Sequence, residues 1–206
     1  MIVLGIDPGS RRCGYGVVAR QGRRLEVVAS GVLVPGELPM PVRLGLILAG
    51  LEALIARTRP DEVAVEQVFS GASARSALVL GQARGVALAV ASRAGLPVHE
   101  YAASAVKLAF TGSGRAGKDQ MMRTAATVLG VRARLSDEAD ALALAVCHLA
   151  RRPLVEPQAA RRADGRDPSP MPPKPPGAHR TAATALARAR ALGRLRPARR
   201  DHRVAP

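Results

Sequence analysis

Apolar residues in several stretches of the chain form the short alternating or continuous runs that are typical of β-strands. Residues 2–7 (IVLGID), 13–21 (CGYGVVARQ) and 24–34 (RLEVVASGVLV) are separated by turns that contain glycine. Residues 62–68 (EVAVEQV) and 96–101 (LPVHEY) are also short apolar or alternating runs. The pattern predicts a three-stranded meander followed by two further strands.

Other segments show the spacing of three or four residues between apolar positions that indicates an α-helix. The first of them ends before Pro60, which disfavours continuation, and the second is closed by Gly95. The predicted helices cover residues 41–58, 73–95, 104–110, 118–130 and 136–152. Strands in hairpins, followed by strands that alternate with helices, predict an α/β fold with a five-stranded mixed sheet flanked by helices on both faces.

The last part of the chain differs from the rest in both proline content and charge. Residues 151–206 hold ten of the 16 prolines and a net charge of +10, against +5 for residues 1–150. We therefore expect one folded domain over residues 1–152 and a basic tail over 153–206 that is disordered. Residues 181–196 (TAATALARARALGRLR) would form either a basic helix on contact with DNA or a solvated part of that tail.

The overall charge indicates the class of partner. A net charge of +15 favours a polyanion, with nucleic acid ahead of an anionic membrane surface. Apolar runs are too short for a membrane span, and the amino terminus does not resemble a signal peptide. Cys13 and Cys147 are too far apart in sequence to form a redox or metal-ligand motif. These observations predict a cytoplasmic protein that does not associate with membranes.

Two acidic residues lie at the ends of predicted buried strands. Asp7 stands before Pro8 in GIDPGS, where it could be a site residue or the acid of an Asx-type turn. Glu66 shares a strand face with Ala64 in an otherwise apolar run. Either Glu66 is buried and its charge is offset by a cation, a basic residue or protonation, or it lies in water at a fraying strand end.

Two further acids begin the last predicted helix. Asp137 and Asp140 are three positions apart, so their side chains are about 60° apart on one side of a helix. Ser136 is a suitable N-cap, and the helix dipole alone would favour Asp137, whereas Asp140 is surrounded by apolar neighbours. We interpret Asp7, Glu66, Asp137 and Asp140 as one site, because clustered carboxylates repel each other unless a hard cation such as Mg²⁺ lies between them.

Five segments together resemble the RuvC family of Holliday-junction endonucleases, in order and in spacing. They are GIDPGSRRCGYGVV, AVEQVF, SALVLGQARGVA, VHEYAASAVK and DEADALALA. The resemblance implies a ribonuclease H-like fold, a homodimer, and RuvA and RuvB as branch-migration partners. It also implies paired, symmetric nicks in a four-way DNA junction that leave 5′-phosphate and 3′-hydroxyl ends.

The resemblance assigns the four acids as catalytic metal ligands, with Asp7 bridging two Mg²⁺ ions for which Mn²⁺ could substitute. Two ions about 3.5 to 4 Å apart can activate water for attack on a phosphodiester. The resemblance also implies that DNA contacts Phe69, Lys107 and Lys118. We further expect Arg75 and Arg115 to contact the DNA backbone. From the residues alone, we would expect Phe69 to be a core residue that caps the strand, whereas the two lysines could equally belong to a solvated surface.

Two other functions agree with part of the sequence. GIDPGS also resembles the first phosphate loop of actin-like ATPases and sugar kinases, but the domain is too short for their paired architecture. A non-catalytic junction-binding or DNA-binding module would explain the positive charge. It would not explain the four acids.

Overall fold

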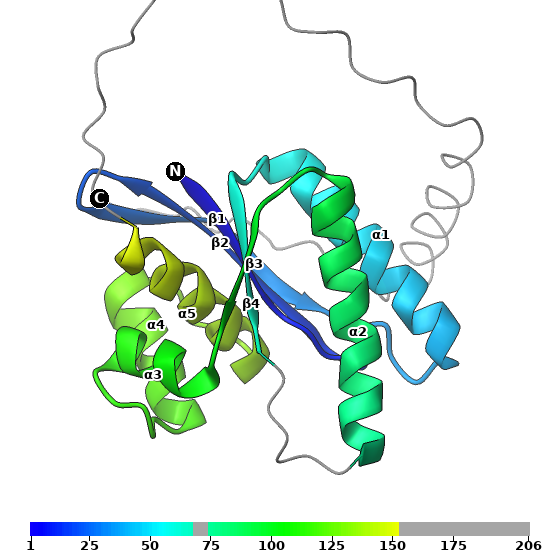
Figure 1. Cartoon of the computed structure of the whole chain (residues 1–206). Coiled ribbons are helices and arrows are strands. Elements are labelled where there is room, and N and C mark those ends of the chain that lie inside the picture. The colour runs from blue at the N-terminus through cyan, green and yellow to red at the C-terminus, as the bar shows by residue number, and fades with distance from the viewer. Residues whose placement is uncertain (68–73, 153–206) are drawn as a thin grey trace, which may run out of the picture.

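The strands form one five-stranded mixed sheet in the computed structural model, which describes residues 1–67 and 74–152 (Figure 1). The sheet order is β3-β2-β1-β4-β5. β1 pairs antiparallel with β2 and parallel with β4, β2 pairs antiparallel with β3, and β4 pairs parallel with β5. The strands are β1 (Ile2–Asp7), β2 (Cys13–Gln21), β3 (Arg24–Leu33), β4 (Glu62–Glu66) and β5 (Val98–Tyr101).

Five helices cover the two faces of the sheet in the part of the chain that the structure describes (Figure 1). α1 and α2 pack on one face, and α3, α4 and α5 pack on the other. The bounds are α1 (Met40–Thr58), α2 (Ala74–Arg93), α3 (Ala103–Thr111), α4 (Lys118–Leu129) and α5 (Ser136–Arg151). The prediction of a five-stranded mixed sheet flanked by helices on both faces is confirmed. The segment 181–196 lies outside the described residues.

The alternation of side chains along β4 divides the core into two layers. Val63 and Val65 are buried against α1 and α2, whereas Ala64 is buried with the residues of α5. The two cysteines are buried in different layers, Cys13 in the first and Cys147 in the second. Glu66 therefore lies on the α5 face of the sheet, as its shared face with Ala64 predicted.

The longest predicted helix, α2, carries apolar residues on more than its sheet-facing side. Ala83, Ala87 and Val90 are buried, but Leu78 is 66% exposed. The apolar residues of α2 that do not face the sheet therefore form a partly exposed surface.

No helix within residues 1–67 and 74–152 combines the length and the apolar character needed to cross a membrane.

Close contact between α5 and the sheet depends on three glycines, Gly5, Gly14 and Gly16, of which the first two make the tightest approaches. A Cβ atom added at Gly5 of β1 would lie 2.0 Å from the Ala141 carbonyl oxygen, and one at Gly14 of β2 would lie 2.0 Å from that of Asp137. Only glycine permits the two backbones to approach in this way. Every residue of α5 from Glu138 to Leu149 except Asp140 is buried as a result.

We expect Gly5→Ala to destabilise the protein by about 1 to 3 kcal/mol, because the added methyl group would force α5 away from β1. Urea unfolding followed by circular dichroism measures this change. The matched control is Gly45→Ala in α1, where no heavy atom lies within 4 Å of the added Cβ. Helix propensity predicts that the control is neutral or stabilising by up to about 1 kcal/mol. An equal effect of both substitutions would contradict the packing argument.

Candidate active site

Asp7 and Glu66 lie next to each other at the carboxyl ends of two adjacent strands. β1 and β4 run parallel, and Ile6 is paired with Val65. Asp7 is the last residue of β1 and Glu66 is the last residue of β4, so the register brings both to one edge of the sheet. In parallel sheets this edge is where loops diverge and leave room for a ligand.

The first turn of α5 carries the other two acids to the same edge. Asp7 is paired with Gly14 of the neighbouring strand β2, and the backbone of Asp137 lies directly on Gly14. Asp140 follows one turn later and is the one residue in the central part of α5 that is not buried. The close contact at Gly14 therefore sets the position of Asp137 and Asp140 relative to Asp7.

The start of α5 differs from the prediction. We expected Ser136 as the N-cap, but the N-cap is Leu135, which makes no side-chain cap hydrogen bond. The Glu138 carboxylate instead accepts a hydrogen bond from the backbone N–H of Arg134, just before the helix, at 3.0 Å. The Ser30 hydroxyl donates a second hydrogen bond to Glu138 at 2.7 Å. Glu138 thus ties the start of α5 to β3, although it stands between the two aspartates in sequence.

The four acids share one electrostatic environment. Burial, followed by the charges of Glu66, Asp140 and Asp137 in that order, raises the pKa of Asp7 to about 8. Burial, followed by the charge of Asp140, raises the pKa of Glu66, and burial is also the main cause of the raised pKa of Asp140. The register and the packing of α5 therefore bring Asp7, Glu66 and Asp140 to one edge of the sheet, in a region where their ionisation is unfavourable.

Two lysines lie close enough to the acids to oppose this effect. The charge of Lys107 on α3 lowers the pKa of Glu66 and Asp140, and the charge of Lys118 at the start of α4 lowers that of Asp7 and Asp140. The positive charges stand beside the acidic edge, where a bound phosphate could also reach them.

The other predicted DNA contacts are less well defined. Arg115 is exposed in the loop between α3 and α4, and its backbone N–H donates to the Ser113 hydroxyl at 3.4 Å. Phe69 and the side chain of Arg75 lie outside the described residues.

Arg84 of α2 also reaches the acidic edge, and no sequence pattern singled it out. Its Nε donates to the Glu66 carbonyl oxygen at 3.4 Å, and its Nη2 pairs with Glu100 at 2.5 Å. Arg84 thus links α2 to the ends of β4 and β5. Its role could not be read from the sequence, because these contacts depend on how α2 packs on the sheet.

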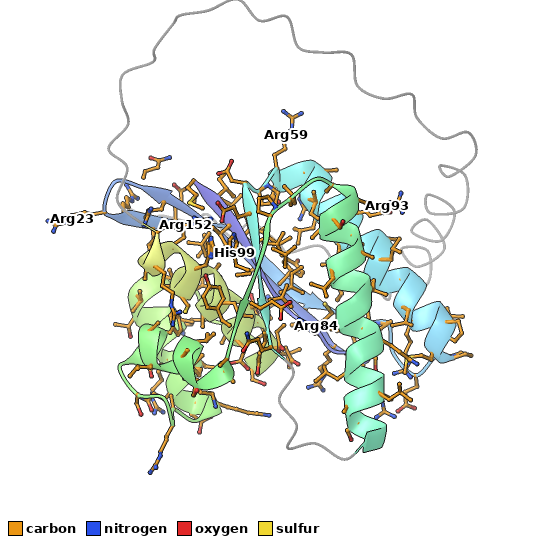
Figure 2. The ribbon with its side chains drawn as sticks, in the orientation of Figure 1. Arg23, Arg59, Arg84, Arg93, His99 and Arg152 are labelled. Carbon is orange, nitrogen blue, oxygen red and sulfur yellow. The ribbon has the colours of Figure 1, made fainter. Side chains whose placement is uncertain are left out.

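A second polar cluster lies at the other end of β4 and was also not predicted. Glu62, His99 and His148 bring their ligand atoms within 4.8 Å of one another, and they are the one group of three or more such residues to do so among the described residues. Burial raises the pKa of Glu62, but hydrogen bonds from Arg152 and His148 outweigh it, so that the pKa is lowered. Figure 2 shows His99 and Arg152 side by side, away from Arg84.

Comparison with known proteins relates this arrangement to a family of nucleases. Residues 3–148 match the family described as crossover junction endodeoxyribonuclease RuvC. The protein of that name from Anaeromyxobacter sp. (strain K) is 68% identical over 206 residues, or 100% of both chains. The one from Marinobacter nauticus is 49% identical over 148 residues, or 71% of this chain and 85% of that protein.

A solved structure is similar as well. The Thermus thermophilus RuvC in complex with Holliday junction substrate has a TM-score of 0.67 and 37% identity, and the similarity covers 72% of this chain and 93% of that chain. The residues matched by the family include all four acids and both lysines.

The raised pKa of Asp7 predicts how stability depends on pH without metal ions. Between the value of 3.8 for an ordinary aspartate and about 8, folded Asp7 holds a proton that the unfolded chain has released. Rising pH in this window therefore destabilises the folded state. We expect thermal unfolding in a chelator to show a melting temperature that falls from about pH 5 to about pH 8. Asp7→Asn should show a shallower fall, and an unchanged slope in this variant would contradict the assignment.

Proposed function

The chain belongs to the RuvC family of crossover junction endodeoxyribonucleases, and on this premise we propose how its residues cut DNA. It has the ribonuclease H-like fold and is an endonuclease that resolves Holliday junctions, and a nuclease of this family depends on divalent metal ions. We assign the catalytic role to four carboxylates. They are Asp7, Glu66, Asp137 and Asp140.

The observation that carries this assignment is the mutual effect of the acids on their pKa values. Burial and three neighbouring carboxylates raise the pKa of Asp7 to about 8, so the residue needs a nearby cation to ionise fully at neutral pH. Oxygen donors in this number suit a hard cation, and we propose two Mg²⁺ ions with Mn²⁺ as a substitute. Such ions, when bound, would activate a water molecule for in-line attack and stabilise the leaving 3′ oxygen, which leaves a 5′ phosphate.

The chain's own residues would position the substrate and the ions. Asp7 lies between the strand that carries Glu66 and the helix that carries Asp140, which favours it as the ligand shared by both ions. Lys107 and Lys118 lie next to these acids and would hold the phosphate groups on either side of the cut. We also propose that DNA contacts Phe69, Arg75 and Arg115. Of these residues, Arg115 is exposed to solvent.

We further propose the domain boundary and the partners. α5 ends at Arg151, and the family match ends at residue 148, which supports a nuclease domain over 1–152 and a separate basic segment over 153–206. A homodimer would supply two active sites for the two strands of a junction, and the exposed face of α2 at Leu78 would suit the contact. Action on chromosomal DNA together with RuvA and RuvB would place the protein in the cytoplasm.

Asp7→Asn and Glu66→Gln should abolish catalysis while they preserve junction binding. We expect Mg²⁺-dependent nicking of a synthetic four-way junction to fall by about 100-fold or more, because each variant removes a metal ligand from the site. Gel-shift titration in Ca²⁺ would report binding separately. Glu26→Gln on the exposed part of β3 is the matched control and should cut at the normal rate. Undiminished nicking by Asp7→Asn would overturn the assignment, and nicking by neither the variants nor the wild type would favour a non-catalytic binding module.

The basic segment gives a separate prediction about affinity. If residues 153–206 contact DNA, their deletion lowers the slope of log affinity against log salt concentration by about 0.9 for each lost phosphate contact. Fluorescence anisotropy with a labelled junction over a range of salt concentrations measures this slope. Nicking at saturating protein should not change, since the four acids are retained. An identical slope in both proteins would show that the segment is solvated and does not bind.

A further inference from the structure

Two histidines, one from β5 and one from α5, converge on one carboxylate oxygen at the start of β4. His148 Nε2 lies 2.7 Å from Glu62 Oε2, and His99 Nε2 lies 2.8 Å from the same atom. The side chain of His148 is 1% exposed, and that of Glu62 is 16% exposed. This arrangement of two imidazoles and one carboxylate is a ligand set that proteins use for transition metals.

The cluster is separate from the four acids. Glu62 and Glu66 stand at opposite ends of β4, which places them about 13 Å apart along the strand. His148 follows Asp140 by eight residues on α5, or about 12 Å along the helix. The same two elements therefore carry an oxygen-rich site at one end and a nitrogen-containing site at the other.

The position of His148 is set by a hydrogen bond on its other ring nitrogen. His148 Nδ1 lies 2.6 Å from the hydroxyl oxygen of Tyr101, at the end of β5. Metal-binding histidines usually make such a bond on the nitrogen that does not face the metal, because it holds the ring in one orientation. With Nε2 bound to a metal, Nδ1–H would donate to the Tyr101 hydroxyl.

A cationic side chain lies where a metal ion would bind. Arg152 Nη2 is 2.5 Å from Glu62 Oε2 and 3.2 Å from His99 Nε2. These contacts are not fully compatible, because His99 Nε2 cannot donate to Glu62 and accept from Arg152 at the same time. Arg152 Nε is also buried and makes no hydrogen bond to any residue that the structure describes. The guanidinium thus supplies positive charge but does not satisfy all the donors and acceptors around it.

We propose that Glu62, His99 and His148 form a binding site for a zinc-like divalent transition metal, and that Arg152 is the cation the metal displaces. Bonds of about 2.0 to 2.2 Å to the metal require the ligand atoms to separate slightly from their present hydrogen-bonding distances. His99 is 34% exposed and Arg152 is 39% exposed, so both can move. Three protein ligands leave a fourth position for water or another ligand.

The bound metal would hold three parts of the fold together, and the site would bind it in preference to Mg²⁺. It would join the starts of β4 and β5 to the end of α5, three elements that are distant in sequence. Mg²⁺ prefers oxygen ligands and would remain at the four acids. Displacement of Arg152 from Glu62 would also leave its positive charge unpaired, next to the start of the basic segment 153–206.

The test uses Co²⁺ as a spectroscopic probe with the full-length protein. We expect one equivalent of Co²⁺ to give the intense visible absorption of a four-coordinate site, Zn²⁺ to abolish it, and excess Mg²⁺ to leave it unchanged. Arg152→Gln should tighten Co²⁺ binding by about tenfold, because it removes the competing charged hydrogen bonds. Tyr101→Phe should weaken it by about 10-fold or more.

Loss of a ligand provides the decisive comparison. His99→Gln should abolish the absorption, and because His99 is partly exposed this variant should fold where a change at buried His148 would not. Glu66→Gln is the matched control, since it alters the other site and should leave the absorption intact. His99→Gln should also retain Mg²⁺-dependent nicking, which keeps this test independent of the proposed active site. The proposal is overturned if the wild type gives no such absorption, or if His99→Gln gives the same absorption as the wild type.

Discussion

The close contact between α5 and the sheet is the constraint on which the rest of the structure depends. Gly5 and Gly14 let the helix backbone lie directly on β1 and β2, and a side chain at either position would separate them. α5 in turn buries one face of the sheet and packs against α3 and α4. Both polar clusters of the protein are assembled across this contact, because α5 contributes Asp137 and Asp140 at its start and His148 near its end.

The proposed active site places unfavourable charge at the edge of the sheet on which the first turn of α5 packs. Burial and neighbouring carboxylates raise the pKa of Asp7, Glu66 and Asp140. The folded protein therefore disfavours the ionised form of these carboxyl groups. Lys107 and Lys118 reduce the repulsion only in part. Bound divalent cations would offset the remaining negative charge, and this would let a protein with a net charge of +15 use the proposed acids on a polyanionic substrate.

Most of the elements could be predicted because their periodicity reflects burial. The alternation in EVAVE correctly placed Glu66 on the face of Ala64, and all five helices begin and end within a few residues of the predicted bounds. The start of α5 was predicted less well, since Ser136 is a good N-cap by residue type but the helix already begins at Ser136, and Glu138 ties its first turn to Arg134. That contact also involves Ser30 on β3, which a local pattern cannot include.

The sequence by itself determined the strands, the helices and the identity of four unusual acids, because each of these leaves a local trace such as a period, a strand-end acid or a charge in an apolar run. Tertiary structure alone decided which residues meet. Asp7 is beside Glu66 through the register of parallel strands, and Glu62, His99 and His148 converge through strand order and the packing of α5. The members of this second cluster have no common motif or spacing, so only the folded chain could bring them together.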